Sequence, residues 1–469
     1  MLDQCSKAFK QNRTWNLARQ LAYGALTCLG RHTLTGILTA CGKQFNDWSA
    51  AYKLFAKERI DNDYLFKVAC CNTIQQLSID QEVVAHMDDT IIKKTGKKVS
   101  GTAWRRDPLG PPFHTNLIWG QRFIQTSLAL PGSSWISQSR AIPVDFHHCP
   151  TAKKPGKKGT EQDWKRYKEK QKQTKLSKKG AERISLLRKR LDQQGAQEKQ
   201  LLLSVDGSYT NNTVLKSLPQ RVTLIGRIRK DTCLYTLPDL SRKGVGRNRV
   251  YGDKLPTPQQ IRQDDQIPWQ KVRAWAAYKV HDFDVKVIKI VRWRAAGGQH
   301  DLQLVVIRPL GYRLTKNSKI LYRKPAYLIC TDPELSIEKL LQAYLWRWEI
   351  EVNFRDEKTV MGCGQAQVRN DKSVEKVPAF IAAMYAFMML AAHKSASKDN
   401  ALDLPRPLWY PKKKCQRQTI GDIRNLVRTQ LWAKALGSNF SGFVNDQFQS
   451  KARRNKVEAL PSALFYSRK

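Results

Sequence analysis

Two short apolar segments of this chain each end in aspartate. Residues 83–87 (Val-Val-Ala-His-Met) are followed by Asp88 and Asp89, and residues 201–205 (Leu-Leu-Leu-Ser-Val) are followed by Asp206. Short apolar runs closed by turn-forming residues are typical of strands buried in a sheet. Aspartate is also common in ordinary turns at strand ends, so neither position alone specifies a function. Together the two runs predict an α/β fold with carboxylates at the ends of buried strands.

Further strands and helices are predicted around these two runs. The predicted strands cover 96–103, 123–130, 141–146 and 222–227, and the predicted helices are a long charged one running through 184–191 and a short one at 211–218. The order of strands, helix, strand and helix, with carboxylates after the two apolar strands, is that of a ribonuclease-H-like α/β core. This inference rests on pattern and analogy, because a fold does not by itself specify a function.

A third carboxylate lies in a helical pattern further along the chain. The segment Tyr-Leu-Trp-Arg-Trp-Glu-Ile-Glu-Val-Asn-Phe-Arg-Asp-Glu-Lys places Tyr344, Arg347, Glu351 and Lys358 at offsets of 0, 3, 7 and 14. At about 100° per residue, these side chains fall within roughly 60° of one another on a helix. One helical face would then present a carboxylate for a metal ion beside a phenol, a guanidinium and an ammonium group that can bind phosphates.

The spacing Y-x2-R-x3-E-x6-K matches the signature of DDE transposases of the insertion-sequence-four type, and the chain resembles that family from residue 82 to about residue 395. The resemblance implies a ribonuclease-H-like catalytic core in which Asp88, Asp206 and Glu351 are the catalytic metal ligands. The family typically carries Asp-x-Thr at the first aspartate, which selects Asp88 with Thr90. A shorter Asp-Thr form would select Asp89 instead. The implied cofactor is Mg²⁺, with Mn²⁺ as a substitute, because hard cations prefer carboxylate ligands.

The resemblance also implies roles for residues that contact DNA. Tyr344, Arg347 and Lys358 would hold the terminal phosphate near the cleavage site. Trp348 and Tyr327 would stack on a flipped-out base and stabilise a DNA hairpin at the element end. The family often has Trp where this chain has Tyr327, and ordinary packing is the alternative role for both rings. The implied partners are double-stranded DNA at element ends and targets, and a second copy of the chain in a paired-end complex.

The charge of the chain is strongly positive. It contains 82 Lys and Arg against 40 Asp and Glu, a formal net charge of +42, which indicates a polyanionic partner and nucleic acid first. Residues 151–200 alone hold 17 basic and 6 acidic residues, a run that is either a solvated face or a phosphate-binding surface. An anionic membrane is disfavoured, because no apolar span of about 18 residues is evident. Without a signal peptide at the N-terminus, we expect a cytoplasmic protein, nucleoid-associated if the host is prokaryotic.

The ten cysteines contain no C-x-x-C pair, which predicts reduced thiols that pack as small hydrophobic side chains. Residues 146–150 (Phe-His-His-Cys-Pro) could form half of a zinc site. No second pair of ligands follows at a suitable spacing, so a local structural role is favoured.

The chain is predicted to have five regions. They are a helical N-terminal domain (1–78), a first part of the core (79–229), a β-rich insertion domain (230–330), a second part of the core with the signature helix (331–398) and a basic C-terminal region (399–469) with one further helix near 420–436. The N-terminal domain would either contact DNA or pack against the core.

These observations predict a DNA transposase of the DDE class. A metal-dependent nuclease with the same core is the enzymatic alternative. A DNA-binding protein derived from a transposase is the other alternative, and a lost carboxylate would mark it, whereas all three are present. The chain has no G-x-x-x-x-G-K-[ST] segment, so an ATP-driven motor is not expected.

Overall fold

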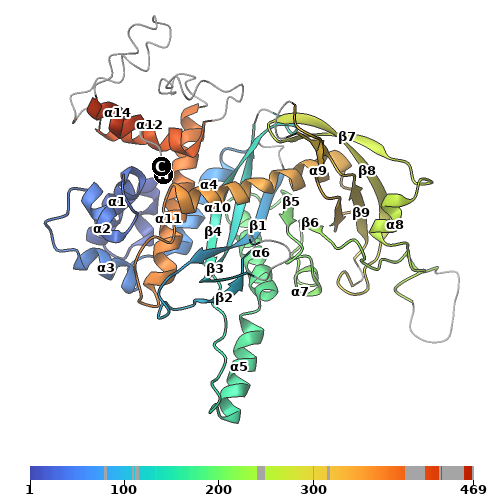
Figure 1. Cartoon of the computed structure of the whole chain (residues 1–469), viewed down its shortest axis with the longest axis horizontal. Helices are drawn as coiled ribbons and strands as arrows, with labels where there is room; N and C mark the ends of the chain where they lie inside the picture. The colour runs from blue at the N-terminus through green and yellow to red at the C-terminus, as the bar shows by residue number, and fades with distance from the viewer. Residues whose placement is uncertain are drawn as a thin grey trace, which may run out of the picture.

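The computed structural model describes most of the chain and shows a mixed α/β protein (Figure 1). The described residues are 1–78, 82–107, 110, 116–132, 134–239, 249–298, 300–313, 317–396, 418–432, 435 and 459–466.

A ten-stranded mixed sheet forms the centre of the molecule, in the order β2-β3-β1-β5-β6-β12-β9-β8-β7 with β4 also paired to β3. Strand β1 pairs antiparallel with β3 and parallel with β5, and β5 pairs parallel with β6. This arrangement is consistent with a ribonuclease-H-like fold. The strands are β1 (Val83–Lys93), β2 (Ala103–Arg106), β3 (Leu117–Pro131), β4 (Ser139–His148), β5 (Leu201–Val205), β6 (Val222–Arg227), β7 (Gln270–Ala276), β8 (Lys279–Val291), β9 (Leu302–Ile307) and β12 (Ala326–Cys330), with a separate pair β10 (Gly311–Tyr312) and β11 (Leu321–Tyr322).

Helices cover both faces of this sheet and its β4 end (Figure 1). They are η1 (Leu2–Ala8), α1 (Asn12–Thr27), α2 (Leu34–Ala40), α3 (Ser49–Ala56), α4 (Asn62–Ile74), α5 (Glu161–Gln173), α6 (Leu176–Asp192), α7 (Asn212–Leu215), α8 (Pro258–Gln263), α9 (Ile337–Trp346), α10 (Trp348–Thr359), α11 (Ser373–Ala396), α12 (Ile420–Trp432) and α14 (Ala459–Tyr466).

The two faces of the sheet bury different sets of side chains, because successive residues of a strand point to opposite sides. Met87 and Val205 face α6, where they pack against Leu187 in one core. Val84 and Leu202 face α9 in a second core. Each fully buried leucine contributes about 1.5–3 kcal/mol, so the two cores fix β1 and β5 between α6 and α9.

The N-terminal helices pack with α11 in a third core at the β4 end of the sheet. Helix α11 corrects the expectation that the chain has no apolar span of membrane length. Residues 373–395 are long and apolar enough to cross a membrane, but 89% of the apolar window is buried inside the protein. A helix that is apolar on all sides is explained here by its central position, where the N-terminal helices and the sheet surround it.

Two predicted elements differ from the structure. The segment 96–103 is a turn and not a strand, and β2 begins only at Ala103. Gly101 has a φ of +73°, and a Cβ there would lie 2.3 Å from Cε1 of His148, so the turn requires glycine. The predicted long charged helix is two helices, α5 and α6, separated at Thr174.

The strands of the predicted insertion continue the central sheet. Strand β12 pairs antiparallel with β6, and β9, β8 and β7 follow it in order. The strands before and after the predicted boundary at residue 230 therefore belong to one sheet. The boundaries of the five regions stay a prediction. In the C-terminal region, α12 confirms the helix expected near residue 420 and α14 adds another, whereas the Pro- and Lys-rich segment at 410–414 lies outside the described residues.

The cysteines of the described part of the chain form no disulfides in this structure. All nine cysteines there are free, and six are buried. Burial raises the pKa of thiols such as Cys5 and Cys149 to about 12, which keeps them protonated and unreactive.

Candidate active site

Pairing of two parallel strands brings the first two predicted carboxylates to one edge of the sheet. Met87 on β1 is the register partner of Val205, the last residue of β5. Asp88 and Asp206 follow these paired residues directly, so they are neighbours across the two strands. Burial is the main cause of the raised pKa of Asp88, and the nearby negative charge of Asp206 acts in the same direction.

The alternation of side chains along β1 separates Asp88 from Asp89. The Asp89 carboxylate accepts a hydrogen bond from the Tyr209 hydroxyl at 3.2 Å and pairs with Arg122 at 3.2 Å. The Asp88 carboxylate pairs instead with Arg347 at 2.9 Å, from the helix that covers the opposite face. The geometry therefore favours Asp88 over Asp89 as the partner of the signature helix.

Arg347 lies where α9 and α10 meet. The backbone tightens here, because the amide of Arg347 donates to Tyr344 O at 3.1 Å and the amide of Ile350 donates to Arg347 O at 3.1 Å. These i→i+3 bonds replace the α-helical pattern that the sequence predicted through this position. The guanidinium contacts Asp88 through Nη1 and Glu351 through Nη2, the latter at 3.2 Å.

The electrostatics of this cluster centre on Arg347. Burial raises the pKa of Asp88 to about 7, even though Arg347 acts in the opposite direction. Burial acts to lower the pKa of Arg347, but Tyr344, Asp88, Glu351 and Asp206 together raise it above its ordinary value. The guanidinium is therefore the counter-ion of the three predicted ligands.

The donor set fits a hard divalent cation, because all three predicted ligands are carboxylates. Among the described residues, no three His, Cys, Asp or Glu side chains lie close enough together to hold a metal ion. The guanidinium of Arg347 occupies the position between Asp88 and Glu351. A divalent cation held by these carboxylates would replace the guanidinium as their counter-ion.

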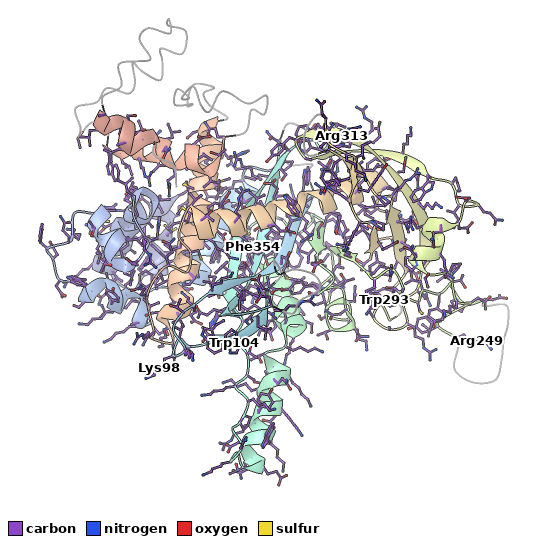
Figure 2. The ribbon with its side chains drawn as sticks, in the orientation of Figure 1. Lys98, Trp104, Arg249, Trp293, Arg313 and Phe354 are labelled. Carbon is purple, nitrogen blue, oxygen red and sulfur yellow. The ribbon has the colours of Figure 1, made fainter. Side chains whose placement is uncertain are left out.

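The other signature residues lie along the same helices. Tyr344 is half-buried with its ring centroid 5.8 Å from Cζ of Arg347, and burial raises the pKa of its hydroxyl. Trp348 is 59% exposed at the first residue of α10. Lys358 lies two turns beyond Glu351, against the Phe354 ring at 5.9 Å, and burial lowers the pKa of its ammonium group. Figure 2 labels Phe354 on α10 where this helix crosses the sheet. Tyr344, Arg347 and Glu351 therefore lie together, and Lys358 is set apart from them.

Tyr327 does not share this surface. It is only 4% exposed, and its ring packs in the core on the α6 side of the sheet, opposite α9 and α10. Its hydroxyl donates a hydrogen bond to the side chain of Gln259. In this arrangement the ring packs inside the protein and is not exposed to a base, so base stacking by Tyr327 stays a prediction that this geometry does not favour.

A buried polar layer under α10 was not predicted from the sequence. Gln125 on β3 is the register partner of Asp88, and its amide, turned so that nitrogen donates, reaches Glu357 Oε1 at 2.9 Å. Asn353 donates to Ala141 O at 2.9 Å and accepts from the Tyr385 hydroxyl at 3.0 Å. The signal in the sequence was the polar trio Gln-Thr-Ser at 125–127 inside an otherwise apolar strand. This layer positions α10, and with it Glu351, over the sheet.

Glu357 in this layer makes the stability of the fold depend on pH. The side chain is fully buried, and burial raises its pKa well above the ordinary 4.5, although Lys358 opposes the shift. Folding therefore binds a proton here, and wild-type stability falls as pH rises from about 4.5 toward the folded pKa. Glu357→Gln removes this loss, so we expect the variant to gain stability over wild type with rising pH, by up to ~1.4 kcal/mol per pH unit.

The measurement is the thermal midpoint Tm of both proteins at pH 5, 6.5 and 8. The Tm of the variant should rise relative to the Tm of wild type as the pH increases. A difference that is constant across this range would show that Glu357 is ionised in the folded protein.

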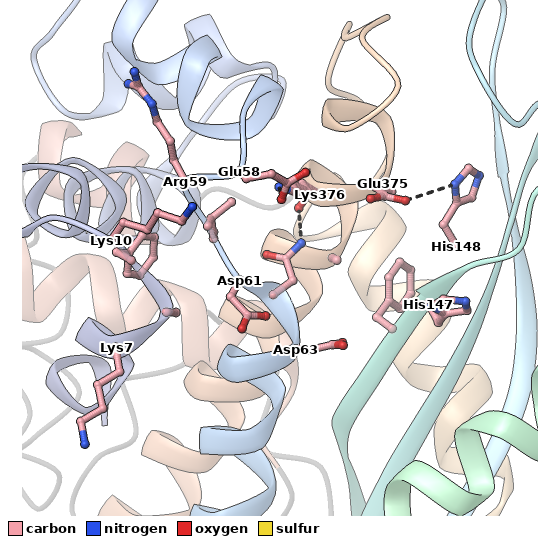
Figure 3. A pocket seen from close by; sticks show the side chains of 16 residues that line it. Lys7, Lys10, Glu58, Arg59, Asp61, Asp63, His147, His148, Glu375 and Lys376 are labelled. Atoms are coloured by element: carbon pink, nitrogen blue, oxygen red, sulfur yellow. Dashed lines mark hydrogen bonds and ion pairs between the residues drawn. The ribbon is translucent and has the colours of Figure 1, made fainter.

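A cavity of about 650 Å³ lies away from the carboxylates, between the N-terminal helices, the end of β4 and the start of α11 (Figure 3). Some of its charged groups pair with one another. The carboxylate of Glu58 pairs with the ammonium group of Lys376 at 2.8 Å. Hydrogen bonds from Lys372 and Lys376 lower the pKa of Glu58 to about 2. His148 lies 4.0 Å from Glu375. His147 and His148 line this cavity, and among the described residues no group of three or more His, Cys, Asp or Glu could hold a metal ion.

Comparison with known protein families identifies the family of the chain. A family described as DDE superfamily endonuclease matches residues 4–298, which is more than half of the chain. The matched stretch contains Asp88 and Asp206 and ends before Glu351. No curated protein matches the chain.

Proposed function

Because the chain belongs to the DDE superfamily endonucleases, we propose that it is a DNA transposase that cleaves mobile-element ends and joins them to target DNA. The observation that carries this proposal is the position of Arg347. Its guanidinium binds Asp88 from the sheet and Glu351 from the helix at once, beside Asp206. One carboxylate from a strand end and one from a helix thus bind a single cationic group, and the charge of Asp206 acts on the same group.

In the proposed reaction, Asp88, Asp206 and Glu351 hold Mg²⁺ or Mn²⁺. Bound divalent cations would activate the attacking oxygen and stabilise the leaving oxygen of the phosphodiester. Arg347 would leave Asp88 and bind a phosphate bidentately, a geometry that suits the planar guanidinium. Tyr344 beside it supplies a hydroxyl donor, and Lys358 supplies a point charge further along α10.

The finer steps rest on the resemblance in the signature. The freed 3′-hydroxyl attacks the opposite strand to form a hairpin, and after reopening it attacks target DNA. Trp348 is the exposed aromatic side chain of the signature, so it is the candidate for stacking on a flipped-out base. Two element ends must be held together for joining, which requires a homodimer in a paired-end complex.

The test uses the whole protein with DNA from the ends of its own element and Mg²⁺. Cleavage that leaves a 3′-hydroxyl or a hairpin, followed by joining of a pre-cut end to a second DNA molecule, supports a transposase. Metal-dependent cleavage without joining would identify a nuclease with the same core. DNA binding without cleavage in either Mg²⁺ or Mn²⁺ would contradict both enzymatic assignments.

A further inference from the structure

A highly basic arm extends from the body of the protein. It consists of the loop 151–160 and helix α5, and it projects away from the sheet (Figure 1). Residues 151–173 hold nine Lys and Arg against three Asp and Glu. None of the residues of α5 is buried, and Figure 2 shows their side chains extending to all sides of the helix. Within the described residues, the arm is therefore a charged, solvent-accessible surface whose helix has no buried side chain.

The arm is built as an ordered structure. A capping box closes the start of α5, in which the Asp163 amide donates to the Thr160 hydroxyl at 3.2 Å and the Thr160 amide donates to the Asp163 carboxylate at 3.0 Å. Trp164 on the helix contacts the loop, with the ammonium of Lys154 5.6 Å from its ring centroid. Isolated helices of about 13 residues are marginal in water. The cap and the aromatic contact offset part of that instability.

The base of the arm is fixed to the sheet close to β1, on the α6 face, which is opposite the face that α9 covers. Helix α6 is fixed to β4 by Arg183, whose two bonds to Asp145 are both 2.7 Å. Gly180, near the start of α6, lies so close to Tyr209 that a Cβ would be 2.6 Å from its ring. The Tyr209 hydroxyl in turn bonds to Asp89, the neighbour of Asp88. One side chain therefore separates the root of the arm from the carboxylate-bearing strand.

We propose that this arm binds the phosphate backbone of duplex DNA that lies across the carboxylate site. The inference rests on the proposed function for the identity of the bound DNA and goes beyond it in naming the surface. Helix α5 has 13 residues and is therefore ~20 Å long, the length of about six base pairs. Lys165, Lys168 and Lys172 fall within roughly 60° of one another on this helix, so they form one cationic stripe.

A solvated charged face is the usual role of a basic run. Two features of this arm argue for phosphate contact. Its charge of +6 is not balanced by carboxylates of the body within the described residues, since Glu161 and Asp163 of α5 itself supply its ion pair and its cap. Its root also lies near the ends of β1 and β5, on the α6 face of the sheet, where Gly180 contacts Tyr209. A duplex that extends from Asp88 and Asp206 over this edge of the sheet would meet the arm.

The test is the salt dependence of DNA binding by the full-length protein. Each lysine that neutralises a phosphate contributes about 0.9 to the slope of log K against log salt concentration. The triple variant Lys165→Gln, Lys168→Gln, Lys172→Gln keeps helix propensity, because Lys and Gln are similar helix formers. We expect its slope on duplex DNA between 50 and 200 mM salt to fall by about 2.7, with weaker binding that does not depend on sequence.

The matched control neutralises three exposed cations at the β7–β8 end of the sheet, Lys271→Gln, Lys279→Gln and Arg294→Gln. A slope for the arm variant equal to that of wild type, or an equal decrease in both variants, would overturn the arm as a specific DNA contact. The same experiment can contradict the proposed function without contradicting the role of the arm. If wild type binds DNA with a steep slope that the arm variant loses, yet never cleaves, the arm inference stands and the transposase assignment does not.

Discussion

Glu351→Gln is expected to abolish metal-dependent DNA cleavage while leaving DNA binding intact. Glutamine has nearly the same shape as glutamate but lacks the charge that a hard cation requires. Glu351 is the one predicted ligand that comes from a helix, and its carboxylate binds the same guanidinium as Asp88. Without it we expect a loss of about 10³-fold or more in the single-turnover cleavage rate, equivalent to ~4 kcal/mol of transition-state stabilisation.

The matched control is Glu349→Gln, which changes the same residue type in the same turn of α10. Two residues along a helix place Glu349 about 200° away from Glu351, so it points away from Arg347. We expect the control to cleave at a rate near that of wild type. Binding of element-end DNA, measured without a divalent cation, should be unchanged in both variants. Equal cleavage by wild type and Glu351→Gln would remove Glu351 from the ligand set.

The sequence allowed the positions of the strand-end carboxylates to be predicted because local rules govern them. A short apolar run such as 201–205, closed by Asp-Gly, favours a buried strand over a helix, and its pairing with β1 brings Asp206 to Asp88. The helical phase of Arg347 and Glu351 was likewise readable from their spacing. The contact from Arg347 to Asp88 joins residues 259 positions apart. No local pattern specifies a contact of that kind.

Other features depended on tertiary packing. Tyr327 opens an apolar strand, and its spacing cannot show which face of the sheet its ring occupies. The segment 96–103 has a strand-like composition, but the close approach of His148 to Gly101 forces a turn. Gln125 and Glu357 form a buried pair between β3 and α10, and burial of a carboxyl cannot be read from a surface-like helical pattern. The features that the sequence did not predict are thus polar contacts between distant residues and the face of the sheet on which a strand residue lies.

The second large effect distinguishes the two adjacent aspartates of β1. Asp88→Asn is expected to reduce metal-dependent cleavage by about 10³-fold or more, because it removes a carboxylate on the side of Glu351 and Arg347. Arg347 keeps Glu351 as its partner in that variant, so the fold should remain intact. Asp89→Asn should retain cleavage, because Asp89 faces α6 and binds Tyr209 and Arg122.

The variant that retains cleavage, Asp89→Asn, is expected to be the less stable of the two. Asp89→Asn removes the ion pair between Asp89 and Arg122 at a partly buried position, which costs about 1–3 kcal/mol and lowers Tm. The asparagine side chain can still accept the Tyr209 hydrogen bond, so the loss should not exceed that range. Single-turnover cleavage and Tm, measured on both variants under the same conditions, form the comparison. If Asp89→Asn were inactive at a temperature where it is folded, and Asp88→Asn active, Asp89 would be the ligand. The first ligand motif would then be the Asp-Thr form, and the contact between Asp88 and Arg347 would be a structural ion pair.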